Sequence, residues 1–128
     1  MKINKQLKID ILDWHITTFQ EATLENQVLK WQEEFRELQI CKNYKMFMEE
    51  LVDCFIVATA LCRFGEVGEL IKDVFNDCII YMCDNRQENW DLSQQAIERA
   101  IFDKMRINRQ RKLAFVNGVY KHQLSSNT

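Results

Sequence analysis

The chain has 128 residues, of which 47% are hydrophobic and 28% are charged, the balance of an ordinary globular domain with one core. A net charge of −2 gives no general attraction to nucleic acid or to an anionic membrane surface, and the longest apolar run falls short of a membrane span. The five cysteines are odd in number and form no C-x-x-C pair, so we expect reduced core thiols in a cytoplasmic protein.

Apolar residues at helical spacing predict an all-α bundle of about five helices, because the chain has no proline and three glycines. The third helix is apolar nearly all round after Asp53, which is typical of the central helix of a bundle. Thr23 is suited to cap the second helix, and Gly65 to end the third with a left-handed residue. The expected helices span residues 5–19, 24–40, 44–64, 67–83 and 92–112.

The fourth helix has one apolar stripe and one charged side. The stripe comprises Val67, Leu70, Ile71, Val74, Phe75, Cys78 and Met82. The charged side comprises Glu69, Lys72, Asp73 and Asp77, and we interpret it as a solvated face.

The fifth helix changes character along its length. Asp91 is the expected N-cap, with Gln94 completing a capping box. The apolar stripe that begins this helix continues into Lys104, Asn108 and Arg111, a set that can bind phosphate oxygens. The alternative is that the two cations only extend outward into water.

The end of the chain predicts a small hairpin or an extended arm. Alternating apolar residues flank Asn117-Gly118, the strongest short hairpin signal. We therefore expect a single domain over residues 1–122 and a flexible tail over residues 123–128.

Two acidic clusters lie on the second and third helices. The first contains Glu33, Glu34 and Glu37, and the second contains Glu50 and Asp53. If these two helices are antiparallel neighbours, their short connection brings the clusters together. The carboxylates then suit one to three divalent cations that also bind a polyphosphate. The alternative is a solvated face in which Lys30 and Arg36 pair locally with the acidic residues.

These motifs resemble a known family. Glu33-Glu34-x-x-Glu37 followed by Glu50-x-x-Asp53 resembles the EExxE…ExxD signature of the MazG-like all-α nucleoside triphosphate pyrophosphohydrolases, and Lys104-x-x-x-Asn108-x-x-Arg111 resembles the K-x-x-x-N-x-x-R element of that family. The segment 118–122 is similar to a tail of some phage-type members, and the resemblance covers residues 14–122. Leu113 stands where many members have an aromatic residue.

The resemblance implies a helical bundle assembled as a homodimer or homotetramer. It implies hydrolysis of a nucleoside triphosphate, with a deoxynucleoside triphosphate as the first expectation, between the α- and β-phosphates, with Mg²⁺ or Mn²⁺ as cofactor. By the same resemblance the metal ligands are Glu34, Glu37, Glu50 and Asp53. Glu33 is then the candidate for orienting or deprotonating the attacking water, and Lys104, Asn108 and Arg111 are the substrate contacts.

Several side chains allow two interpretations. Trp31 could stack on the base of the nucleotide or pack in the core, and His122 could reach a phosphate or lie at the surface. His15 fits a packing or surface residue better than a metal ligand. A di-iron bundle would need Glu-x-x-His pairs, which neither histidine provides.

The alternative function is a non-catalytic helical interaction module derived from the same family. Neither nucleic acid nor a membrane is an expected partner.

Overall fold

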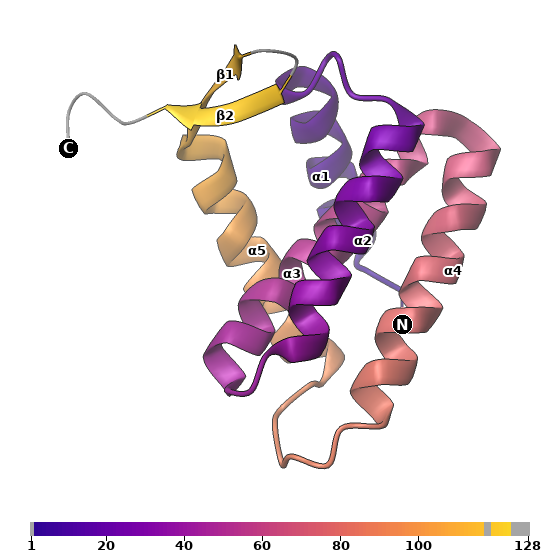
Figure 1. Cartoon of the computed structure of the whole chain (residues 1–128), viewed down its shortest axis with the longest axis vertical. Coiled ribbons are helices and arrows are strands. Elements are labelled where there is room, and N and C mark those ends of the chain that lie inside the picture. Colours follow the sequence, from indigo (N-terminus) through magenta and orange to yellow (C-terminus); the bar gives the residue numbers. More distant parts are fainter. Residues whose placement is uncertain (1, 117–118, 124–128) are drawn as a thin grey trace.

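The computed structural model describes the backbone of residues 2–116 and 119–123 and the side chains of residues 2–111. The expected all-α bundle is confirmed (Figure 1). Its elements are α1 (Lys5–Thr18), α2 (Leu24–Ile40), α3 (Tyr44–Ala60), the 3-10 turn η1 (Leu61–Phe64), α4 (Gly65–Asp84), α5 (Gln94–Gln110), β1 (Lys112–Val116) and β2 (Val119–Gln123). In the described part of the chain, we find no helix that is both long enough and apolar enough to cross a membrane.

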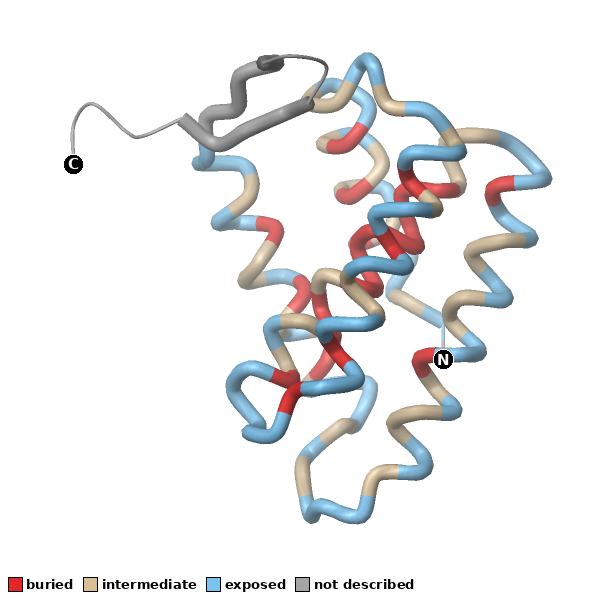
Figure 2. The backbone as a smooth tube through the Cα atoms, viewed as in Figure 1, coloured by how far each residue is buried: buried red, intermediate tan, exposed pale blue. Residues whose placement is uncertain are grey.

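Helix α3 is the centre of the bundle. It contacts each of the other four helices, and its residues from Cys54 to Ala60 are all buried. Figure 2 shows the buried positions gathered along α3 and on the faces of α1, α2 and α5 that meet it. The apolar composition of the second half of α3 therefore predicts its place correctly, since a helix that is hydrophobic on all sides must be covered on all sides.

The helix starts depend on side-chain caps. Thr23 caps α2 as expected, with its hydroxyl accepting a hydrogen bond from the backbone N–H of Asn26 at 3.1 Å. The expectation that Asp91 caps the fifth helix is wrong. Ser93 is the cap, and its hydroxyl accepts from the N–H of Ala96 at 3.2 Å. Asp91 instead accepts from the N–H of Ser93 at 3.1 Å, and Gln94 donates to a backbone carbonyl of the N-terminal segment, so no capping box forms.

A tight turn joins α3 to α4 through two glycines. The last turn of the expected third helix is the 3-10 turn, and Gly65 follows it with φ of 81°, a backbone conformation that favours glycine. A Cβ atom at Gly68 would lie 1.9 Å from the carbonyl oxygen of Leu61. Only a residue without a side chain permits this close approach of α4 to the turn.

A largely buried polar cluster joins α1, α2 and the 3-10 turn η1. His15 is 4% exposed, and its Nε2 lies 3.2 Å from the side-chain oxygen of Gln27. Its Nδ1 lies 2.9 Å from the guanidinium of Arg63, which also donates to the carbonyl of Phe19. Burial, and secondly the charge of Arg63, lower the pKa of His15 to about 4. His15 is thus a packing residue.

Helix α4 has its charged side largely exposed, as expected, but it also exposes part of its apolar stripe. Only Gly68 and Ile79 of its 20 residues are buried. One edge of the apolar stripe packs on the core, where Phe75 stacks on the ring of Trp31. The other edge faces solvent. On the charged side, Glu69, Asp73 and Asp77 are exposed and Lys72 is half-buried. Part of this side borders a cavity of about 490 Å³ beside α1 and the N-terminal segment. The stripe is wider than the core contact, so periodicity alone does not show which part of it is covered.

The C-terminal strands pair as expected. β1 and β2 are antiparallel, with Val116 opposite Val119 and Leu113 opposite His122. The turn pair Asn117-Gly118 and residues 124–128 of the expected tail lie outside the described residues.

Candidate metal site

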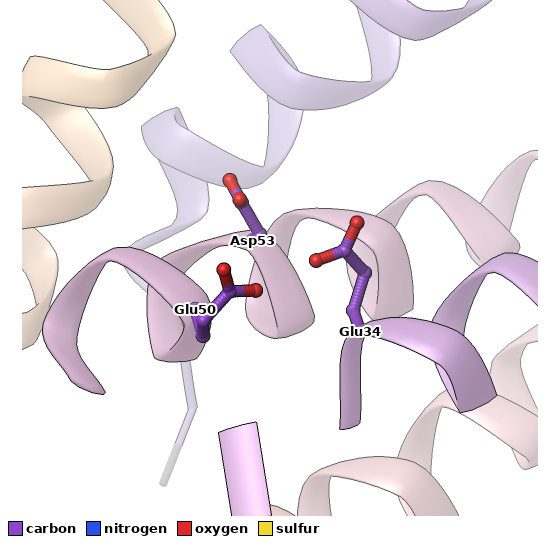
Figure 3. A group of neighbouring side chains, drawn as sticks. All are labelled: Glu34, Glu50 and Asp53. Carbon is purple, nitrogen blue, oxygen red and sulfur yellow. The ribbon is translucent and has the colours of Figure 1, made fainter. Parts of the chain in front are cut away.

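Three carboxylates converge between α2 and α3. Glu34 extends from α2, and Glu50 and Asp53 extend from one face of α3, so that an oxygen of each lies within 4.8 Å of an oxygen of the others. Figure 3 shows Glu50 and Asp53 side by side on α3 and Glu34 extending toward them from α2. The short connection at residues 41–43 makes the two helices neighbours, and the spacing of three residues puts Glu50 and Asp53 on the same side of α3.

These carboxylates are largely removed from water. The side chain of Glu34 is 13% exposed and that of Asp53 is 29% exposed. The Oε2 atom of Glu50 is buried and has no hydrogen-bond partner among the described residues. A buried carboxylate oxygen without a partner costs free energy. A bound cation would compensate this cost.

The pKa values reflect the same crowding. Burial, followed by hydrogen bonding with and repulsion from Glu34 and then Glu37, raises the pKa of Glu50 to about 8. Burial in the first place raises the pKa of Asp53 to about 6, although Lys104 opposes the rise. In the absence of a cation, Glu50 therefore keeps at neutral pH a proton that an isolated carboxyl group releases.

Two lysines border the cluster. The Nζ of Lys104 lies 3.7 Å from Oδ1 of Asp53, because α5 packs on α3 through buried apolar residues and turns this part of its stripe toward the carboxylates. The Nζ of Lys30 lies 3.5 Å from Oε1 of Glu34. From the sequence, Lys30 was expected only as a local partner of the acidic residues, and its i,i+4 spacing from Glu34 was the available signal.

The other predicted polar residues lie at or beyond the edge of the cluster. Glu37 is exposed but close enough to Glu50 to contribute to its raised pKa. Glu33, the residue before Glu34 on α2, is also exposed. Asn108 is half-buried and donates to the sulfur of a methionine on its own helix at 3.8 Å. Arg111 is exposed at the C-terminal cap of α5. Among the described residues, neither of these two contacts the carboxylates.

Trp31 lies in the core, in agreement with the packing interpretation and not with base stacking. It is 4% exposed, and two rings stack on it nearly parallel, that of Phe35 at 4.7 Å and that of Phe75 at 3.8 Å between centroids. A nucleotide base would have to displace this packing. His122, the other residue with two interpretations as a substrate contact, lies on β2. Its side chain is not among the side chains that the structure describes.

The arrangement defines the chemistry available to this site. Three carboxylate oxygen donors suit a hard divalent cation such as Mg²⁺, and the two neighbouring ammonium groups suit phosphate oxygens. Burial raises the pKa of the Cys54 thiol far above its usual range, so in the absence of a metal that thiol is protonated at neutral pH. A scan against models of protein families finds no match, and searches of curated proteins and of solved structures find none either.

Proposed function

We propose that the protein is a Mg²⁺-dependent nucleoside triphosphate pyrophosphohydrolase. The observation that carries the proposal is the convergence of Glu34, Glu50 and Asp53 from two helices, with the ammonium of Lys104 beside Asp53. The resemblance to MazG-like enzymes supplies the reaction, and the geometry supports it because the family's acidic motif and the first residue of its basic motif meet at one place. The expected substrate is a deoxynucleoside triphosphate.

The residues present fit a divalent cation. The partnerless buried oxygen of Glu50 and the neighbouring oxygens of Glu34 and Asp53 would hold Mg²⁺ or Mn²⁺, with Glu37 on the exposed side. The bound cation supplies a coordinated water of lowered pKa and offsets phosphate charge. The proposed homodimer or homotetramer is not needed to bring these three carboxylates together, because they come from a single chain.

The chain's own groups would position the triphosphate. Lys104 would bind an oxygen of the β- or γ-phosphate and stabilise the charge on the departing pyrophosphate. Asn108 and Arg111 follow Lys104 along α5 and would contact the substrate further from the carboxylates. Glu33 would orient the water or accept its proton. The water oxygen attacks the α-phosphorus, the bond from that phosphorus to the bridging oxygen breaks, and pyrophosphate leaves with a nucleoside monophosphate as co-product.

The test is pyrophosphate release from a panel of common and modified nucleoside triphosphates, with Mg²⁺, with Mn²⁺ and with EDTA. We expect metal-dependent pyrophosphate and an equal amount of monophosphate. Asp53→Asn should abolish turnover, whereas the control Asp13→Asn, at an exposed position of α1, should not. Release of orthophosphate would place the cut at another bond. Absence of both turnover and metal-dependent stabilisation in folded protein would refute the proposal and favour the interaction module.

A further inference from the structure

Lys30 on α2 lies outside both motifs of the family that the chain resembles, yet it borders the carboxylate cluster. At about 100° per residue, Lys30 is about 40° from Glu34 around the helix, so both side chains leave α2 on the same side. The Nζ of Lys30 lies 3.5 Å from Oε1 of Glu34, the residue that α2 contributes to the cluster (Figure 3). The Glu34 side chain is 13% exposed and that of Lys30 is 56% exposed. The lysine therefore extends from solvent to the edge of a largely buried site.

The charge of Lys30 also acts on the carboxylate of the neighbouring helix. Burial raises the pKa of Asp53, and the charges of Lys104 and then of Lys30 oppose this rise. The Nζ of Lys104, which extends from α5, lies 3.7 Å from Oδ1 of the same residue. Two ammonium groups from two different helices therefore border one set of carboxylates.

Both ammonium groups are needed to make the site attractive to a polyphosphate. With Glu34, Glu50 and Asp53 all ionised, one Mg²⁺ leaves the cation and its ligands with a net negative charge, which repels phosphate. One ammonium group only neutralises this charge. The second gives the site a net positive charge, so the contribution of Lys30 is not redundant with that of Lys104.

The partner of Lys30 depends on whether the site holds a cation. In the metal-free chain its ammonium group pairs with Glu34. Once the carboxylate of Glu34 binds a cation, Lys30 loses this counter-charge and is repelled by the cation. Its ammonium group then lies beside a site at which Mg²⁺ keeps positions for phosphate oxygens. We infer that Lys30 is a second phosphate contact, which exchanges Glu34 for the polyphosphate chain of the substrate when the metal binds. This inference rests on the proposed function.

One substitution should have opposite effects on two ligands. Lys30→Ala should tighten Mg²⁺ binding in titration calorimetry by about 3- to 10-fold, because the ammonium group no longer competes for Glu34. At saturating Mg²⁺, the same variant should bind inorganic tripolyphosphate about 10-fold more weakly or worse, because a charge-assisted contact is lost. Lys30→Arg keeps the positive charge and should bind tripolyphosphate nearly as tightly as the wild type. A residue with a purely structural role would change both affinities in the same direction.

Arg36→Ala is the matched control, because it removes the same charge from the same helix. Arg36 is exposed and about 200° from Glu34 around α2, so its loss should change neither affinity. In turnover, Lys30→Ala should raise KM for the nucleoside triphosphate about 10-fold and leave kcat within about threefold.

The outcomes separate this inference from the proposed function. Tripolyphosphate binding as tight in Lys30→Ala as in the wild type, or weaker Mg²⁺ binding in that variant, would overturn the role of Lys30. Metal-dependent release of pyrophosphate by the wild type would in that case still support the proposed function. The expected pair of opposite effects, in a wild type that hydrolyses no nucleoside triphosphate, would support the role of Lys30 and overturn only the reaction.

Discussion

Replacement of Glu50 by glutamine should stabilise the metal-free protein and remove its response to Mg²⁺. In the folded chain, burial in the first place and then Glu34 and Glu37 raise the pKa of Glu50 from 4.5 to about 8. The folded state therefore keeps a proton that the unfolded chain has released, and the free energy of unfolding falls as pH rises from 4.5 to 8. The glutamine side chain carries no charge at any pH in this range, so the variant does not have this loss.

The size of the effect follows from the same pKa values. At about 1.4 kcal/mol per pH unit, the interval from 4.5 to about 8 corresponds to at most about 5 kcal/mol. The site is open to solvent on one side, and screening reduces this to about 2 kcal/mol. The difference in unfolding free energy between the variant and the wild type should be near zero at pH 4.5 and reach about 2 kcal/mol by pH 8.

Urea unfolding in EDTA from pH 4.5 to pH 9 measures this difference, with Glu49→Gln as the matched control at an exposed position of α3. In Mg²⁺ at 100 times its dissociation constant, the wild type and the control should gain about 2.7 kcal/mol, and Glu50→Gln should gain much less. Parallel pH curves for the wild type and Glu50→Gln would refute the reasoning about the crowded carboxylates. An undiminished Mg²⁺ response in Glu50→Gln would refute the metal assignment.

Two further predictions concern Lys104 and His15. Lys104→Ala should lower kcat/KM for pyrophosphate release about 10- to 100-fold, through loss of charge stabilisation. Lys72→Ala, which removes a similarly covered lysine that pairs with Asp73, should leave kcat/KM unchanged, and equal effects would remove Lys104 from the site. Because burial and then Arg63 lower the folded pKa of His15 to about 4, this residue alone should remove up to about 3 kcal/mol of unfolding free energy between pH 6.5 and pH 4, while Glu50 acts in the opposite direction. The difference in unfolding free energy between the wild type and His15→Gln should therefore fall by this amount over the same range in urea unfolding, and a constant difference would refute the assignment.

The helices and the meeting of the two acidic clusters were predictable from the sequence. The periodicity of apolar residues predicts the bounds of each helix to within a few residues. The short connection between α2 and α3 makes these two helices neighbours, so their acidic sides face each other. Thr23 and Gly65 serve as expected, because capping and positive φ depend on local chemistry. Ser93 and Asp91 can both accept the hydrogen bond of an N-cap. The helix begins at Gln94, and this start makes Ser93 the cap.

The long-range partners were not predictable. Trp31 and Glu34 are three residues apart and lie on neighbouring parts of α2. Trp31 packs away from the carboxylates because Phe75 of α4 offers a ring to stack on. The contact of His15 with Arg63 joins residues 48 positions apart, and no periodic pattern marks such a pair. For α4, the pattern shows an apolar stripe wider than one neighbour needs, but not which edge faces the core.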